Sequence, residues 1–407
     1  MDVPAPEEML RRLRGVAGVE LLLGRLEGAP AVYVVGGVVR DALLGGGSRD
    51  IDLVIEGDAA ELAQSLGLEV RSHDRFGTCT ARADGLSFDL ARSRRERYAH
   101  PGALPEVEPA PLAEDLRRRD FTVNALAVAL NGPQAGELSA PPGALEDLAA
   151  GRLRVLHDAS FRDDPTRLLR LARYAARLGF EPDARTWELA RAAIAGGALE
   201  TVSGERIGAE LRLLAGEPDP LAALGWLERL GIDGALEPGF GLGGEEALAR
   251  RALELLPADG RPGRLALALA GRRLAPGALS ALLDRLAFPA AERDGIVAAA
   301  GRAGELAQRL GEAAGPAAIA SAVDGAAPEA VALAGALGPG AAARRWLDEL
   351  RHVRLEIGGD DLLLAGIPAG PAIGHGLRAA LAGKLEGRAP DRAAELALAL
   401  AAARAQP

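Results

Sequence analysis

The sequence is poor in cysteine, aromatic residues and lysine. Of its 407 residues only 3% are aromatic, so the core must consist mostly of leucine, alanine and valine. Its one cysteine, Cys79, excludes an intrachain disulfide framework or a cysteine metal cluster, and a reducing, cytoplasmic setting is therefore expected. Lys384 is the only lysine, so nearly all positive charge is arginine, the side chain that makes forked contacts to phosphate.

Long apolar runs are also missing. No run reaches the ~18 residues expected of a membrane span. Met1–Leu10 is acidic and contains proline, unlike a signal peptide, so no membrane partner is expected. The net charge of −10 argues against non-specific coating of nucleic acid but allows local basic tracks. A chain of this length should form two or three domains.

The first ~145 residues have a mixed α/β hydrophobic pattern. The pattern predicts strands at residues 32–35, 52–55, 86–90 and 124–130, and a short helix at 61–66. Residues 101–111 are rich in proline and have little periodicity, which predicts a loop.

From Leu145 onward strand signals nearly vanish and helical spacing takes over. One helix is predicted to start near Pro165, with Asp163 or Asp164 able to cap it and Gly179 ending it. Further helices are predicted at residues 187–194, 205–214, 221–230, 245–256 and 265–270. We therefore predict an α+β fold in three parts: a mixed α/β head (1–145), an all-α neck (146–240), and a helical body and tail (241–407).

One stretch of the head indicates phosphate chemistry. Gly36-Gly37 follows the first predicted strand, and Asp50 and Asp52 stand two positions apart beside the second. Side chains at i and i+2 of a strand share a face, and adjacent carboxylates repel each other unless a cation neutralises them. Oxygen ligands suit Mg²⁺, while a glycine pair lets the backbone approach phosphate closely. The stretch therefore predicts a metal–nucleotide site.

Further motifs follow this one along the chain. In order, the motifs are Gly36-Gly37-Val38-Val39-Arg40-Asp41 with Arg49-Asp50-Ile51-Asp52-Leu53-Val54, Arg118-Arg119-Asp120-Phe121-Thr122-Val123-Asn124-Ala125, Asp163-Asp164-Pro165-Thr166-Arg167 with its following helix, and Ser203-Gly204-Glu205-Arg206-Ile207. Together they resemble the class II tRNA nucleotidyltransferases, the CCA-adding enzymes and related bacterial poly(A) polymerases of the DNA polymerase β superfamily. The resemblance implies a polymerase-β-like sheet in the head.

The resemblance also implies roles for individual residues. Asp50 and Asp52 would hold two Mg²⁺ ions, and Asp89 would be a third carboxylate, although on pattern alone it could be a solvated strand residue. The incoming nucleotide would be contacted by Gly36, Gly37, Arg40, Arg119, Asp120, Asn124, Asp164, Arg167, Arg170 and Arg173. Arg94, Glu96 and Tyr98, a pattern also seen in the family, would hold the segment near Pro101.

Asp164 and Arg167 would choose the base. Their spacing alone fits a helix cap with a surface ion pair; the resemblance makes them a protein template. A carboxylate accepts from the exocyclic amine of C or A, and a guanidinium donates to a ring nitrogen or carbonyl. UTP and GTP would thus be rejected. The chain departs from the family pattern at Asp163, where glutamate is common, and at Ala140-Pro141-Pro142-Gly143, which lacks the usual Asp-Pro pair.

The sequence therefore predicts a template-independent enzyme that adds C and A from CTP and ATP to the tRNA 3′ end and releases pyrophosphate. The tail would hold the tRNA elbow by shape and backbone contacts. The arginines of the tail, Arg344, Arg345, Arg351 and Arg354, either follow tRNA phosphates or form a solvated face. A CC-adding or A-adding enzyme, a bacterial poly(A) polymerase and a non-catalytic RNA-binding protein remain alternatives.

Overall fold

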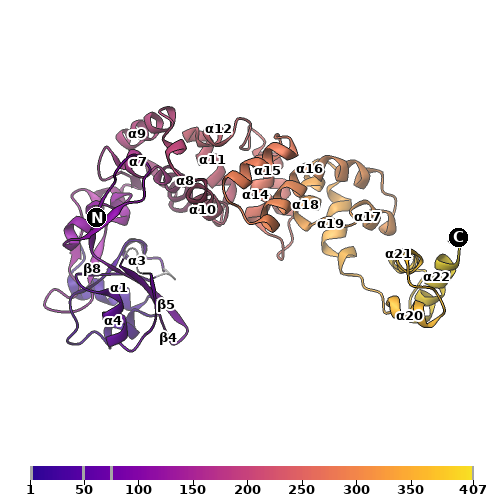
Figure 1. Ribbon diagram of the computed structural model, residues 1–407, viewed down its shortest axis with the longest axis horizontal. Coiled ribbons are helices and arrows are strands. Elements are labelled where there is room, and N and C mark those ends of the chain that lie inside the picture. Colours follow the sequence, from indigo (N-terminus) through magenta and orange to yellow (C-terminus); the bar gives the residue numbers. More distant parts are fainter. Residues whose placement is uncertain (1–2, 48–50, 74–76, 406–407) are drawn as a thin grey trace. The chain divides into compact units, whose positions relative to one another are not determined.

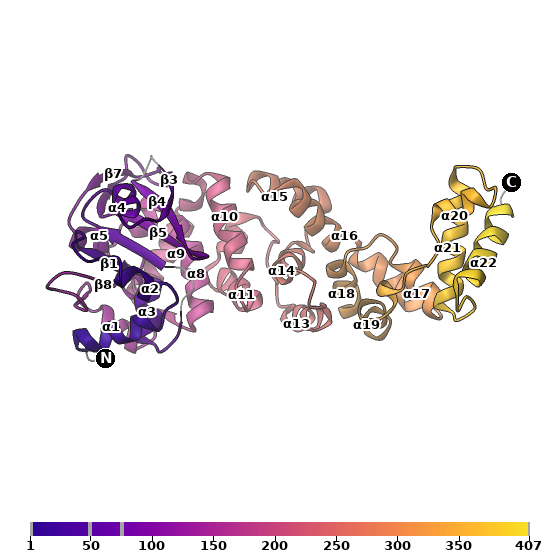
Figure 2. The same cartoon turned by 90° about the horizontal axis from the view of Figure 1, so that it is seen from below.

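The computed structural model describes residues 3–47, 51–73 and 77–405. The chain forms two compact units (Figures 1 and 2). Unit 1 comprises Met1–Glu210 and Leu230–Ala235, and unit 2 comprises Leu211–Arg229 and Leu236–Pro407. None of the described helices is long and apolar enough to cross a membrane. The division into head, neck and tail stays a prediction.

The centre of unit 1 is a seven-stranded mixed sheet with the strand order β3-β4-β5-β2-β1-β8-β9. Its strands are β1 (Val32–Val35), β2 (Ile51–Ile55), β3 (Glu69–His73), β4 (Thr78–Ala83), β5 (Leu86–Arg92), β8 (Ala127–Ala129) and β9 (Leu138–Ser139). β2 and β5 pair in parallel, whereas the other neighbours are antiparallel. The α+β prediction is confirmed.

Helices cover the sheet and continue beyond it in unit 1. They are α1 (Pro6–Arg14), α2 (Val19–Leu23), α3 (Gly37–Leu43), α4 (Ala59–Ser65), α5 (Leu112–Arg117), α6 (Ala144–Ala149), α7 (Ser160–Asp163), α8 (Thr166–Leu178), α9 (Ala184–Ala195) and α12 (Ile232–Leu236). Figure 1 shows α4 beside β4 and β5 in the indigo part of the chain, and α4 contacts both strands. Apolar side chains of β1 and α5, among them Val35, Leu112 and Leu116, share one core cluster.

The strand predictions hold near the site and fail at the periphery. β1 coincides with the predicted strand, and β2 and β5 overlap theirs. Within the predicted loop at 101–111, β7 (Glu106–Pro109) instead pairs with β6 (Arg94–Arg97), as proline is tolerated in such an edge pair. The strand predicted at 124–130 is restricted to β8, because Thr122–Asn124 form a 3₁₀ turn.

The helix predictions after residue 145 are largely confirmed. α8 ends at Gly179, whose positive φ of 65° suits glycine. Its N-cap is Pro165, which offers no side-chain bond, but the Asp164 carboxylate accepts from the backbone N–H of Thr166 at 3.1 Å. Two-residue strands, β10 (Arg152–Leu153) and β11 (Glu181–Pro182), were not predicted. Helices α10 (Gly204–Ala215) and α11 (Pro220–Leu230) run across the boundary of the two units.

Unit 2 is built from helices in the part of the chain that is described. These are α13 (Glu246–Leu255), α14 (Pro262–Gly271), α15 (Pro276–Arg285), α16 (Ala290–Glu312), α17 (Pro316–Ala322), α18 (Pro328–Ala336), α19 (Gly340–Asp348), α20 (Gly359–Leu364), α21 (Pro371–Leu385) and α22 (Arg392–Arg404). Several begin with proline, whose missing N–H costs nothing in the first turn. The buried helix α18 packs against α13, α16 and α19, and α20, α21 and α22 share a separate core cluster.

Candidate functional site

A cavity of about 650 Å³ in unit 1 is lined by residues from three of the sequence motifs. The predicted site residues that line it are Gly36, Gly37, Asp52, Asp89, Arg119, Asp120, Asn124, Asp164, Arg167 and Arg170. Arg40 and Arg173 are not among the lining residues, and Asp50 lies outside the residues that the structure describes. The cavity therefore unites residues that are far apart in the sequence.

Two carboxylates lie side by side in this cavity. The parallel register of β2 and β5 pairs Asp52 with Asp89. Both side chains are exposed, while Ile51, Leu53 and Leu90 beside them are buried. The Thr80 hydroxyl on β4 donates to Asp89 Oδ1 at 2.8 Å.

These carboxylates have the ligand chemistry that Mg²⁺ requires. Neighbouring strands lie about 4.8 Å apart, so the paired positions of Asp52 and Asp89 suit a shared hard cation, which prefers carboxylate oxygens. Among the described residues, which do not include Asp50, no three His, Cys, Asp or Glu side chains are grouped so that they could hold a metal ion. Asp50 and Asp52 thus remain the predicted metal ligands, and Asp89, predicted as a third catalytic carboxylate, is paired with Asp52 in the sheet.

The glycine turn begins α3 and shapes the cavity wall. Gly36 has a φ of 71°, and a Cβ atom there would lie 3.3 Å from Arg119 Nη1, so glycine suits both the backbone and the space. Its N–H donates to the Leu126 carbonyl at 2.9 Å. Arg40, 2% exposed, lies behind this wall and donates to Asn124 Oδ1 at 2.5 Å. Arg40 therefore holds a cavity residue in place.

Asp120, another residue that lines the cavity, is the centre of a buried hydrogen-bond network. Its Oδ2 accepts from Arg170 at 2.6 and 2.9 Å, and its Oδ1 accepts from Asn124 Nδ2 at 3.1 Å. Burial raises the pKa of Asp120, but Arg170 and Asn124 lower it by a larger amount, so the pKa lies below its ordinary value. Arg170 and Arg173 both lie within 3.4 Å of Glu210.

Tyr174 also lines the cavity and was not predicted as a site residue. The guanidinium carbons of Arg40, Arg170 and Arg173 lie 5.7, 5.4 and 5.0 Å from the centre of its ring. Such cation–π contacts place positive charge beside the cavity. The sequence indicates this cluster only through the spacing on the predicted helix, where Arg170 precedes Tyr174 by four positions and Arg173 by one.

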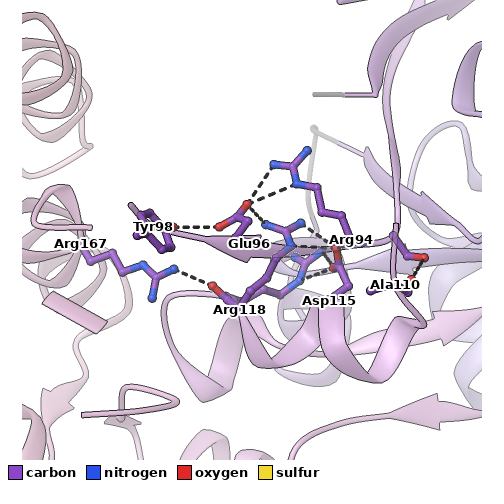
Figure 3. Close-up of polar contacts among 9 residues, drawn as sticks. Arg94, Glu96, Tyr98, Ala110, Asp115, Arg118 and Arg167 are labelled. Atoms are coloured by element: carbon purple, nitrogen blue, oxygen red, sulfur yellow. Dashed lines mark hydrogen bonds and ion pairs between the residues drawn. The ribbon is translucent and has the colours of Figure 1, made fainter. Parts of the chain in front are cut away.

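A second buried acid, Asp115 on α5, was missed entirely. It is 0% exposed and accepts from Arg118 Nη2 at 2.7 Å and from Arg119 Nη2 at 3.1 Å (Figure 3 shows the Arg118 contact). Burial raises the pKa of Asp115, but the two arginines lower it by a larger amount. The pKa therefore lies below its ordinary value, and the carboxyl is ionised at neutral pH. The spacing of i+3 and i+4 to two arginines was the available signal.

Glu96 links this acid to the segment after β6. Glu96 Oε1 accepts from Arg118 Nη1 at 2.8 Å, and its Oε2 accepts from the Tyr98 hydroxyl at 2.9 Å (Figure 3). Burial and the Glu96 charge raise the pKa of Tyr98, so its hydroxyl stays protonated as a donor. Arg94, also predicted to act here, lies 3.2 Å from Glu96.

The predicted base-selecting pair, Asp164 and Arg167, also lines the cavity. Asp164 Oδ1 accepts from the Thr166 hydroxyl at 2.6 Å and from Arg206 Nη2 at 2.8 Å. Arg167 is 5% exposed and donates to Ser160 Oγ at 2.7 Å and to the Arg118 carbonyl at 2.6 Å. Within the described residues no ion pair joins Asp164 to Arg167, so the surface-ion-pair interpretation is wrong.

The arginines of the tail are partly occupied. Arg351 donates to both oxygens of Asp259, at 2.5 and 2.9 Å, and Arg345 lies 3.8 Å from Glu349. Arg354 donates to the backbone carbonyl of Arg351 at 2.6 Å. A contact of this cluster with tRNA stays a prediction.

A mixed sheet that carries paired carboxylates, a Gly-Gly turn and an arginine-lined cavity is suited to group transfer from a nucleotide. In agreement, residues 32–154 match the family described as the poly A polymerase head domain.

Named relatives point the same way. An A-adding tRNA nucleotidyltransferase of Geobacter sulfurreducens is 43% identical over 235 residues, or 56% of this chain and 26% of that protein. A CC-adding tRNA nucleotidyltransferase of Deinococcus radiodurans is 42% identical over 214 residues, or 51% of this chain and 56% of that protein. The chain thus matches about a quarter to just over half of the length of these relatives.

A solved structure covers more. A CCA-adding enzyme in an apo form has a TM-score of 0.81 and 30% identity over 98% of this chain and 100% of that one. The chain belongs to the tRNA nucleotidyltransferase family, whose members are enzymes.

Proposed function

We propose that this chain adds C and A from CTP and ATP to the 3′ end of tRNA without a nucleic-acid template. The observation that carries the proposal is a single cavity with the Asp52–Asp89 pair on one wall and Asp164 with Arg167 on another. One set suits transfer and the other suits base selection. Solved relatives described as CCA-adding enzyme complexes with CTP, with ATP and with tRNA support this proposal.

The carboxylates would carry the transfer step. Asp50, Asp52 and Asp89 would hold Mg²⁺, which in such sites activates the attacking hydroxyl and neutralises charge on the leaving group. The tRNA 3′-hydroxyl oxygen would bond to the α-phosphorus, the bond to the β-phosphate oxygen would break, and pyrophosphate would leave. Thr80 would keep the Asp89 carboxylate directed into the cavity through its hydrogen bond.

Arg119 is the best-placed phosphate ligand of the chain. Asp115 holds its Nε and Nη2 at 3.3 and 3.1 Å, which leaves Nη1 beside the Gly36 turn. A guanidinium fixed on one edge presents its other edge in a constant direction, which favours a forked phosphate contact. Asp120 and Asn124 also line the cavity, where their polar atoms would meet the ribose hydroxyls.

The base would be matched by Asp164 and Arg167. Arg167 uses two of its five N–H groups for Ser160 and the Arg118 carbonyl, so three remain for a base. A carboxylate acceptor favours the amino groups of C and A and repels the carbonyls of U and G. Unit 2, with its helices, would hold the tRNA elbow.

An A-adding enzyme is the second candidate. Three A-adding relatives are 43–45% identical to the chain, whereas the multifunctional CCA proteins are 37–38% identical. This difference favours restricted addition.

The test uses the purified full chain, Mg²⁺ and tRNAs that end at the discriminator base, at C or at CC, each with CTP, ATP or both. Stepwise C, C, A addition supports the proposal. Addition of A to a CC end alone makes the chain an A-adding enzyme, addition of C alone makes it a CC-adding enzyme, and long A tails on unrelated RNA make it a poly(A) polymerase. Absence of any transfer would overturn the proposal.

A further inference from the structure

Asp164 and Arg167 have opposite charges and stand three residues apart, a spacing at which such side chains normally attract each other. An ion pair between them would occupy the very groups that are proposed to contact the base. In the described structure each instead has other partners, from four different positions of the chain. What keeps the two side chains apart therefore bears on base selection.

Asp164 is held through one oxygen only. Oδ1 accepts from the Thr166 backbone N–H at 3.1 Å, from the Thr166 hydroxyl at 2.6 Å and from Arg206 Nη2 at 2.8 Å. Among the described residues, Oδ2 has no hydrogen-bond partner. The carboxylate thus has one saturated oxygen and one that is available as an acceptor, and its rotation is restricted.

Arg206 is itself anchored. Its Nη1 donates to the carbonyl of Gly102 at 2.9 Å, while Nη2 holds Asp164. Gly102 is buried, and its backbone N–H donates to the Arg162 carbonyl at 3.2 Å, so this segment is held by a hydrogen bond of its own. The guanidinium therefore bridges a fixed backbone segment and the Asp164 carboxylate.

Arg167 is held by a different set of partners from those of Asp164. Ser160, 0% exposed, accepts from Nη1, and the Arg118 carbonyl accepts from Nη2 (Figure 3 shows the latter contact). The Arg118 side chain is in turn bound by Asp115 and Glu96. The guanidinium of Arg167 is thus bound to Ser160 and to the Arg118 carbonyl, and among the described residues no ion pair joins it to Asp164.

We propose that Arg206 and Ser160 are positioning residues for base selection, which keep Asp164 and Arg167 from pairing with each other. The inference rests on the proposed function, because it concerns the choice of nucleotide at the same site. Without Arg206, Asp164 would be free to turn toward Arg167, and both would lose contact with the base. Discrimination against UTP and GTP would then fall more than the rate of transfer.

The test compares Arg206→Met with Arg206→Lys in the full chain. Steady-state kcat and KM are measured for CTP, ATP, UTP and GTP on tRNA substrates that lack part of the 3′ end. In Arg206→Met, the ratio of kcat/KM for the preferred nucleotide to that for UTP or GTP should fall about ten- to hundredfold, the range expected for a lost charged hydrogen bond. Arg206→Lys, which keeps the charge, should recover part of the ratio, whereas kcat for the preferred nucleotide should change much less.

Ser160→Ala and Ser160→Thr form a second pair that tests the same idea from the Arg167 side. Removal of the hydroxyl should lower the ratio, and Ser160→Thr, which retains it, should preserve more selectivity than Ser160→Ala. If Arg206→Met does not fold, as judged by circular dichroism, the serine pair decides. Arg185→Met is the matched control, since Arg185 pairs with Asp158 and does not line the cavity.

Unchanged selectivity in both Arg206→Met and Ser160→Ala, with a selective wild type, would overturn the inference and leave the proposed function intact. A wild type that transfers nothing, or that uses all four nucleotides equally, would contradict the proposed function itself. An equal loss of kcat for every nucleotide would show a structural role only and would also overturn the inference.

Discussion

The ion pairs of Asp115 beside the cavity of unit 1 differ from the Arg351–Asp259 pair in unit 2. Asp115 is fully buried between Arg118 and Arg119, whereas the side chain of Asp259, which pairs with Arg351, is 63% exposed. Taking charges out of water is costly, and a buried pair is retained only with good geometry and full hydrogen bonding. An exposed pair is screened and contributes little. The comparison indicates that Asp115 is buried because it fixes the direction of two guanidinium groups.

A similar contrast exists among the carboxylates that line the cavity or lie beside it. Asp52 and Asp89 are exposed carboxylates, while Asp115 and Asp120 are buried and bound to arginine. Asp52 and Asp89 thus present carboxylate to solvent, and the buried pair serves to hold Arg119 and Arg170.

The largest effect is expected from the exposed carboxylates. Asp52→Ala should reduce nucleotide transfer by at least about 10²–10³-fold, because charge stabilisation in the transition state is lost. Its unfolding transition and tRNA binding should stay close to those of the wild type. Asp158→Ala, which removes a carboxylate outside the cavity, is the control. Full activity of Asp52→Ala would remove it from the transfer site.

The next effect concerns stability. Asp115→Ala should lower the free energy of unfolding by about 3–5 kcal/mol, since two arginines lose their buried partner. Asp259→Ala breaks an exposed pair and should cause no measurable change. Urea unfolding followed by circular dichroism makes the comparison. Equal losses in the two variants would show that burial is not what distinguishes these pairs.

The pH dependence of the free energy of unfolding should also show that the Asp115 carboxylate is held by arginine. The pKa of Asp115 in the folded chain lies below the ordinary value of 3.8, because Arg118 and Arg119 outweigh the effect of burial. Its contribution is therefore complete above pH 3.8 and is lost as the pH falls through the folded pKa. The free energy of unfolding should decrease with falling pH in this window, and Asp115→Asn should make the decrease shallower. A slope identical to that of the wild type would contradict the assignment.

The smallest expected effect is the loss of stability on replacing Gly179, which has a left-handed backbone conformation. Gly179 ends α8 with φ 65°, and a Cβ atom there would meet no other atom within 4 Å. Gly179→Ala should therefore cost only the left-handed backbone penalty, about 1 kcal/mol. A thermal unfolding scan beside the wild type measures it. A loss as large as that of Asp115→Ala would mean that Gly179 has a packing role.

The site could be predicted from the sequence to the extent that it consists of local motifs. The Gly-Gly turn and Asp52 were identified from short spacings, Asp164 and Arg167 from the family resemblance of their motif, and the cavity contains all of them. Asp115 was missed because its importance depends on burial, and nothing in the six-residue sequence of α5 shows that Asp115 is buried while its neighbour Glu114 is not.

Contacts between distant segments were equally out of reach. The bond from Arg206 to Asp164 spans 42 positions, and that from Arg167 to the Arg118 carbonyl spans 49. β7 was missed because prolines bracket it, and its pairing with β6 outweighs their local preference for a loop. Local pattern identifies the groups that do chemistry, whereas the groups that hold them depend on tertiary structure.

The most direct test of the account is the nucleotide preference of Asp164→Ala beside that of the wild type. Each protein is given CTP, ATP, UTP or GTP separately with Mg²⁺ and a tRNA that lacks part of its 3′ end, and single additions are resolved on a gel. The account predicts that the wild type strongly prefers C or A, and that the variant still transfers nucleotides but with most of this preference lost. An undiminished preference in Asp164→Ala would contradict it.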